Sequence, residues 1–162
     1  KFSTTLRFLQ SMTDFLRVGF KLYANKMTQF NAAMSYNLNN AITGTYPNFM
    51  IDYASALVSR GGLTGAANGA VSSSGGLVEF TWTDNTGSGN AQATDKALLV
   101  VYNPAKDQAI YDNAGAARSV GAQNLAMPND FIGDDVEAFI GFISEDGKEV
   151  ANSVYIGSVT VA

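Results

Sequence analysis

Residues 97–103 read ALLVVYN, and in this stretch apolar side chains occupy both alternating sets of positions. Successive side chains of a β-strand point to opposite faces of the sheet, so the pattern predicts a strand that is apolar on both faces. The stretches near 136–144 and 150–161 have the same property. Residues 77–83, LVEFTWT, alternate between apolar and polar instead, which predicts a strand with one buried and one exposed face.

From about residue 49 onwards, short apolar runs of this kind are separated by turn signals such as Asn103-Pro104-Ala105-Lys106 and Glu145-Asp146-Gly147-Lys148. The runs predict seven strands, near 51–59, 77–83, 97–103, 108–112, 117–126, 136–144 and 150–161. Short strands at this spacing favour a mainly antiparallel β-sandwich of the immunoglobulin or fibronectin-III type over residues 49–162.

Residues 1–46 show the period of an α-helix instead. Their apolar side chains recur every three or four residues, at Phe2, Leu6, Leu9, Met12, Leu16, Phe20, Tyr23, Met27 and Phe30. Asn25 or Thr28 is the candidate cap between two helices, one long and one short, and Gly44 with Tyr46-Pro47-Asn48 is expected to end the second. We therefore expect an α+β fold, with N-terminal amphipathic helices packed on the sandwich.

The strands that are apolar on both faces require a second cover. In a fibronectin-like topology they are neighbours in one sheet, and only one face of that sheet meets the opposing sheet. The other face would leave a large apolar patch in water, which is typical of an interface. We expect the helices of the same chain to cover it, and the alternative is that a neighbouring subunit does so.

The composition excludes several kinds of chemistry. The chain has no Cys and no His, which excludes disulfides, thiol nucleophiles, Ser-His pairs and zinc sites built on these residues. No apolar run reaches the roughly 18–20 residues of a membrane span. The cations of the first helix are too widely spaced for a nucleic-acid site. We expect neither an enzyme nor a bound cofactor.

The charge is unevenly distributed along the chain, which has a net charge of −4. Residues 1–60 contain six cations and two carboxylates, a balance of +4, whereas residues 61–162 contain four cations and twelve carboxylates, a balance of −8. Such an asymmetry can steer head-to-tail association or bring the basic part of the chain towards an anionic partner, and two solvated faces of different composition explain it equally well.

Two acidic stretches are weak candidates for a metal site. Asp84 and Asp95 stand at the first and twelfth positions of a segment that faintly resembles a calcium loop, but its flanks are predicted strands. Asp135 and Glu137 share one face of a predicted strand. A flexible loop and a solvated strand face explain these residues better, so we predict no metal site.

Several stretches resemble a Bacteroidota family of small proteins that carry a domain of unknown function. They are GFKLYANKMTQFNAAMSYNLNNAITGTYPNFMIDY, LVEFTWTDNTGSGNA, DKALLVVYNP, AGAARSVG and DGKEVANSVYIG, and the similarity covers most of residues 12–157. The resemblance implies a helical region followed by a sandwich, and a further basic, glycine-rich segment ahead of Lys1. It implies no activity and no site residues.

Low charge and two-faced strands favour a structural protein that self-associates into a homo-oligomer, filament or shell, at a cell surface or in a virion-like particle. The residues expected to make the association contacts are Phe8, Phe15, Leu22, Phe139, Ile143 and Tyr155. The alternative is a binding module in which the loops at 84–92 and 112–116 hold a glycan or a protein.

Overall fold

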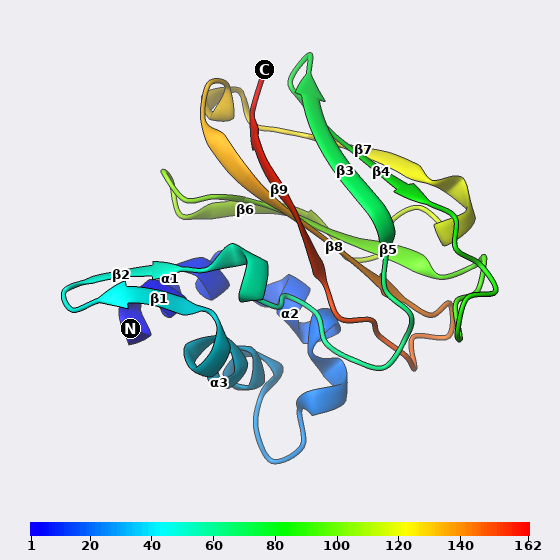
Figure 1. Ribbon diagram of the computed structural model, residues 1–162, viewed down its shortest axis with the longest axis horizontal. Coiled ribbons are helices and arrows are strands. Elements are labelled where there is room, and N and C mark those ends of the chain that lie inside the picture. The colour runs from blue at the N-terminus through cyan, green and yellow to red at the C-terminus, as the bar shows by residue number, and fades with distance from the viewer.

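The strands that are apolar on both faces lie side by side in one sheet (Figure 1). The computed structural model describes residues 1–162. One antiparallel sheet has the order β6-β5-β8-β9, with the bounds β5 Lys96–Asn103, β6 Gln108–Asp112, β8 Asp135–Ile143 and β9 Val154–Thr160. The facing sheet has the order β3-β4-β7, with the bounds β3 Ala67–Ser74, β4 Leu77–Thr83 and β7 Ala122–Ala126. The predicted antiparallel sandwich is confirmed, although β3 takes the place of the strand predicted over 51–59.

The four-stranded sheet separates two apolar cores. On β5, Leu99 and Val101 face the three-stranded sheet and belong to the core between the sheets, together with Trp82. Leu98 and Val100 face the other way and belong to a core shared with the N-terminal helices. All four β5 side chains are buried, so the prediction that the chain's own helices cover the second face is confirmed.

Three α-helices form this cover: α1 Phe2–Gln10, α2 Thr13–Gly19 and α3 Gln29–Asn40. The prediction of a single long helix from the periodicity is wrong, because α1 ends at Gln10 and α2 begins at Thr13. There the Ser11 and Thr13 hydroxyls donate hydrogen bonds to carbonyls of the preceding turn, which favours a bend. Thr28 caps α3 as expected, since its hydroxyl accepts a hydrogen bond from the Asn31 N–H at 3.1 Å.

A β-hairpin follows α3. The predictions that the helix continues to about residue 44 and that a strand covers 51–59 are both wrong. The hairpin consists of β1 Ile42–Thr45 and β2 Asn48–Ile51, and the 3₁₀ turn η2 Tyr53–Ser55 comes next. The β-branched residues of β1 favour an extended chain over a helix. The segment after η2 is irregular because it joins the helices to the sandwich; Asn37, buried in α3, exchanges two hydrogen bonds with the backbone of Leu57.

Two further strand predictions need correction. Strand β3 was not predicted, because most of its inward positions hold small residues, Ala67, Gly69 and Ser73; a Cβ added at Gly69 would lie 2.7 Å from Cγ2 of Ile156. The strand expected over 117–126 begins instead as the 3₁₀ turn η3 Arg118–Val120, and only β7 is extended. Gly121, with φ of 79°, redirects the chain between them. Two other 3₁₀ turns are η1 Lys21–Tyr23 and η4 Asn129–Phe131.

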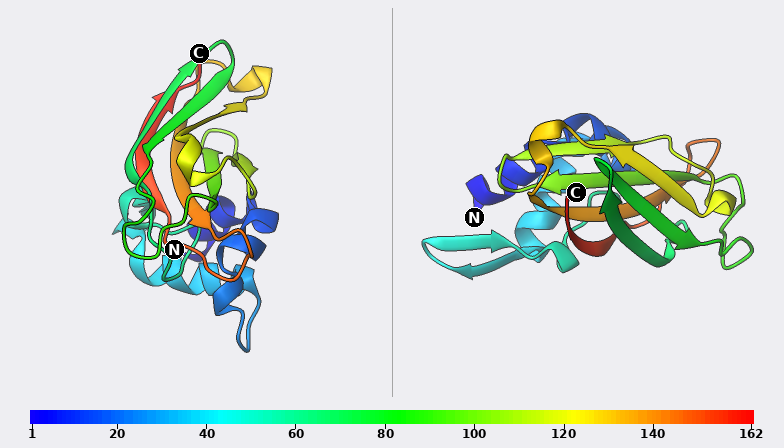
Figure 2. Two further views of the ribbon diagram at one scale, coloured as in Figure 1. Left: turned by 90° about the vertical axis from the view of Figure 1, so that its right-hand side faces the viewer. Right: turned by 90° about the horizontal axis from the view of Figure 1, so that it is seen from above.

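The molecule has two distinct ends. The β1–β2 hairpin projects from the body at one end, beside the N-terminus (Figures 1 and 2). The loop that follows β4 and the turn between β8 and β9 lie at the opposite end in the same views.

Candidate functional site

Most of the residues expected to make association contacts pack within their own chain. Phe8, Phe15 and Phe139 have no exposed surface, and the rings of Phe8 and Phe139 lie 5.9 Å apart in the core under the helices. Ile143 is also buried in this core. A neighbouring subunit is therefore not needed to cover the sheet.

The two remaining residues of that set differ from each other. Tyr155 is half-buried; its hydroxyl donates a hydrogen bond to Oε1 of Glu137 at 2.5 Å, and its ring stacks on Tyr53. Leu22 is 45% exposed and is the member of the set that presents free surface. The structure therefore does not bring these six residues together on one outer face.

The four acidic metal candidates do not form a cluster, and each accepts a hydrogen bond from another side chain, although Oδ1 of buried Asp95 has no partner. Asp84 accepts hydrogen bonds from the hydroxyl and N–H of Thr86, and these bonds lower the pKa of its carboxyl. Asp135 accepts a hydrogen bond from Thr160, and Glu137 accepts one from Tyr155. No group of three or more Asp or Glu residues in the chain is arranged to hold a metal ion.

Asp95, the fourth candidate, lies inside the sandwich as the partner of Arg118. Both side chains are buried, and Oδ2 of Asp95 accepts from Nε of Arg118 at 3.0 Å and lies 2.9 Å from its NH2 nitrogen. The other guanidinium N–H groups donate to the carbonyls of Thr64 and Gly65 and to Oδ1 of Asn85. This ion pair ties four loop segments together, which is a structural role.

The hairpin end of the molecule exposes apolar side chains that the sequence analysis did not single out. Tyr46 at the hairpin tip is 86% exposed, and Met50 on β2 and Phe2 at the start of α1 are each 61% exposed. Nζ of Lys1 lies 5.9 Å from the centroid of the Phe49 ring. The signal in the sequence is an aromatic residue inside a turn, Thr45-Tyr46-Pro47-Asn48.

A cleft of about 360 Å³ lies beside the hairpin. Its walls come from α1, β2, η2 and the turn between β5 and β6, and consist of Thr4, Arg7, Met50, Ile51, Tyr53, Tyr102, Pro104 and Asp107. The Tyr102 hydroxyl donates to Oδ1 of Asp107 at 3.0 Å, whereas Arg7 is exposed and makes no ion pair. This end of the molecule is therefore largely apolar, with the unpaired cation Arg7 and the carboxylate Asp107 in the cleft.

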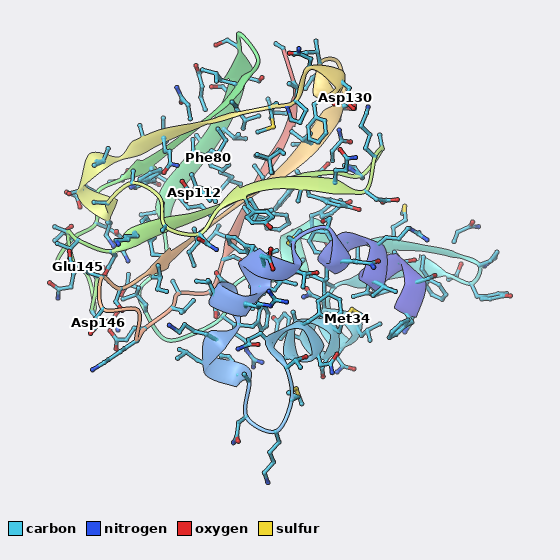
Figure 3. The ribbon with its side chains drawn as sticks, turned by 180° about the vertical axis from the view of Figure 1, so that it is seen from behind. Met34, Phe80, Asp112, Asp130, Glu145 and Asp146 are labelled. Atoms are coloured by element: carbon cyan, nitrogen blue, oxygen red, sulfur yellow. The ribbon has the colours of Figure 1, made fainter.

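The opposite end is polar and carries several carboxylates. Glu145, Asp146 and Glu149 are exposed around a depression of about 240 Å³ whose lining contains no hydrophobic residue. Hydrogen bonds from the Ser144 hydroxyl and the Lys148 N–H lower the pKa of Asp146. Glu145 and Asp146 lie on the side of the molecule away from the hairpin (Figure 3).

The loops at 84–92 and 112–116, expected to present a ligand in the alternative interpretation, are tied to the sandwich by hydrogen bonds. Asn90 accepts from and donates to Thr64, and Asp112 accepts from the Ala114 N–H and from Gln123. No cleft of the chain is centred on either loop.

A family of unknown function, DUF6266, matches residues 1–157. The chain belongs to the DUF6266 family. No curated protein and no solved structure matches the chain. This DUF6266 chain contains no helix with the length and hydropathy needed to cross a membrane. Family membership thus assigns no chemistry, and the surfaces described above are the basis for a functional proposal.

Proposed function

We propose that the protein is a non-enzymatic structural protein that associates head to tail, with the hairpin end of one copy against the acidic end of the next. The observation that carries the proposal is the placement of an exposed apolar hairpin, with the cations Lys1 and Arg7 beside it, and of an acidic surface at opposite ends of one molecule. A contact between unlike surfaces forms rings if the rotation closes and filaments if it does not. The proposed setting is a cell surface or a virion-like particle, and the proposed source is the Bacteroidota.

Charge complementarity supports a second copy as the occupant of the hairpin end. Lys1 and Arg7 are the cations beside the hairpin, whereas Lys21, which also contributes to the +4 balance of residues 1–60, lies beside Gly147 at the acidic end. At the acidic end, Glu145, Asp146 and Glu149 outnumber the neighbouring cations Lys148 and Lys21. Attraction between exposed charges acts over about one Debye length, roughly 10 Å at 0.1 M salt, so it orients copies as they approach.

The hairpin itself supports the same conclusion. Its two strands pair only with each other, and an isolated two-stranded hairpin is of marginal stability in water. Burial of the exposed Tyr46 and Met50 side chains against a partner would stabilise the complex by about 25 cal/mol for each Å² of apolar surface removed from water.

The test is the solution mass of the chain over a concentration series, with electron micrographs of the same samples. We expect species larger than 17.1 kDa that dissociate as salt is raised. The double substitution Tyr46→Ser with Met50→Ser is expected to give a monomer, whereas Ile132→Ser, at an apolar residue that is 50% exposed and lines neither the hairpin cleft nor the acidic depression, serves as the matched control. A monomer of 17.1 kDa at every concentration would overturn the proposal.

A further inference from the structure

A second cleft, of about 470 Å³, lies on the helical side of the molecule and plays no part in the proposed association. Its walls come from α3, the chain around η1 and the segment before β3, and consist of Tyr23, Met27, Ala32, Ser35, Tyr36, Asn39, Asn40 and Arg60. The lining contains one cation and no carboxylate.

Arg60 is held in this cleft by aromatic rings and not by hydrogen bonds. Its Cζ lies 4.4 Å from the ring centroid of Tyr23 and 4.9 Å from that of Tyr36, within the range of a cation–π contact. Its backbone N–H donates to the carbonyl of Gly19 at 2.9 Å, which fixes the base of the side chain. The half-buried guanidinium makes no hydrogen bond and no ion pair within the chain.

The contrast with Arg118 shows what this arrangement leaves available. The Arg118 guanidinium uses its donors on oxygen atoms of its own chain, and it is completely buried. The Arg60 guanidinium is positioned while its N–H groups stay free. A planar guanidinium with free N–H groups matches the two oxygens of a carboxylate, and positioning it in advance lowers the entropy cost of binding.

The other walls of the cleft carry the neutral polar side chains of Ser35, Asn39 and Asn40. The side-chain amides of Asn39 and Asn40 each donate to a carbonyl of their own helix, at 2.9 and 2.8 Å, and this orients them. Their Oδ1 atoms and the hydroxyl of Ser35 make no hydrogen bond within the chain, so they are available to ligand hydroxyl groups. Tyr23 and Met27, which are 37% and 48% exposed, supply apolar surface of the kind on which the C–H face of a sugar packs.

We propose that this cleft binds a hydroxylated organic carboxylate of the sugar-acid class. Arg60 pairs with the carboxylate, the asparagine amides and Ser35 contact the hydroxyl groups, and a tyrosine ring lies against the sugar ring. Inorganic phosphate would use the guanidinium but none of the other groups. The cleft volume lies within the roughly 300–1,000 Å³ typical of small-molecule sites.

The experiment is a titration of the whole chain with glucuronate, followed by NMR shifts of backbone amides, at a concentration where the chain is monomeric. Glucose and inorganic phosphate are titrated in parallel. We expect saturable shifts centred on residues 23–40 and 60 with glucuronate, and binding at least tenfold weaker with glucose and phosphate. Because monomer is used, the result does not depend on whether the chain assembles.

Three variants locate the site. Arg60→Gln is expected to weaken glucuronate binding at least tenfold, and Arg17→Gln, with the same charge change at an exposed side chain of α2, to leave it unchanged. Asn40→Asp keeps Arg60 in place but adds a carboxylate to the cleft wall, and we expect it to weaken binding without affecting folding. Phosphate binding as tight as glucuronate would overturn the sugar-acid assignment. Absence of saturation, or an equal effect of Arg17→Gln, would overturn the site.

Discussion

At the scale of single residues, Arg118 is the clearest case of a side chain on which several loops depend. It is fully buried, pairs with Asp95, and also bonds to the segments at Thr64–Gly65 and Asn85. Its Cζ lies 4.1 Å from the centroid of the Phe142 ring. Removing one member of a buried ion pair leaves the other charge uncompensated, which costs about 3–5 kcal/mol.

We therefore expect Arg118→Met to lower the free energy of unfolding by about 3–5 kcal/mol, measured by urea titration. The matched control is Arg17→Met, because Arg17 forms an ion pair with Asp14 in which both side chains are about two-thirds exposed. Exposed pairs of this kind contribute about 0–1 kcal/mol. Equal losses in the two variants would show that the Arg118 network does not hold the loops.

At the scale of elements, the contact between the helices and the four-stranded sheet decides whether the chain folds alone. Phe139 lies at the centre of this contact, on β8, with no exposed surface. A carboxylate at this position would be desolvated and unpaired, so we expect Phe139→Asp to leave no folded monomer. Phe139→Ala is expected to lower the free energy of unfolding by about 3–5 kcal/mol.

Phe2→Asp is the control, since it makes the same change at a phenylalanine that is 61% exposed. We expect its unfolding free energy to stay within about 0.5 kcal/mol of the original. Circular dichroism and urea unfolding measure both variants. A folded Phe139→Asp monomer would contradict the helix cover described here.

Three tyrosines in the same contact make the free energy of unfolding depend on pH. Burial, followed by the negative charges of Glu137 and Asp107, raises the pKa of Tyr53 to about 12. Burial and a hydrogen bond to a carboxylate raise the pKa of Tyr102 and of Tyr155 further still. In the unfolded chain a tyrosine has a pKa of about 10.

The sign of the pH dependence follows from these pKa values. Above about pH 10 the unfolded chain loses tyrosine protons that the folded chain keeps, so the free energy of unfolding falls as pH rises toward about 12. We expect urea midpoints to decrease from pH 9 to pH 11, and Tyr53→Phe to make the decrease shallower. Tyr46→Phe, at a residue that is 86% exposed, is the control. An unchanged slope in Tyr53→Phe would contradict the assignment.

At the scale of the whole molecule, head-to-tail association predicts the behaviour of a mixture. Glu145→Lys with Glu149→Lys disables the acidic end and leaves the hairpin intact, while Tyr46→Ser with Met50→Ser does the reverse. Each variant alone is expected to be monomeric. A mixture is expected to form a complex of two chains and nothing larger, because one functional end of each kind remains.

Sedimentation of the separate and mixed samples tests this prediction. If the contact were between two identical hairpins, the Glu145 and Glu149 variant would still associate by itself. If both ends were irrelevant, both variants would associate as the original chain does. Only a complex that requires both variants supports a contact between unlike surfaces.

The sequence by itself determined the layers of this protein. A period of 2 with apolar residues at both alternating sets of positions specifies a strand that is covered on two sides. A period near 3.6 specifies the helices that cover it. Both signals are local, as are the Thr28 cap and the turn at Asn103. The family resemblance is also carried by the residues, and it is confirmed at the level of DUF6266.

Tertiary structure alone decided the features that depend on distant partners. Strand β3 has no apolar pattern, because close approach to β9 requires Gly69 to be small. The buried positions of Phe8 and Phe139, the pairing of Asp95 with Arg118 and the placement of Arg60 against Tyr23 and Tyr36 join segments far apart in the chain. Such contacts leave no periodicity in the sequence, since they are set by how the layers pack and not by the spacing of neighbouring residues.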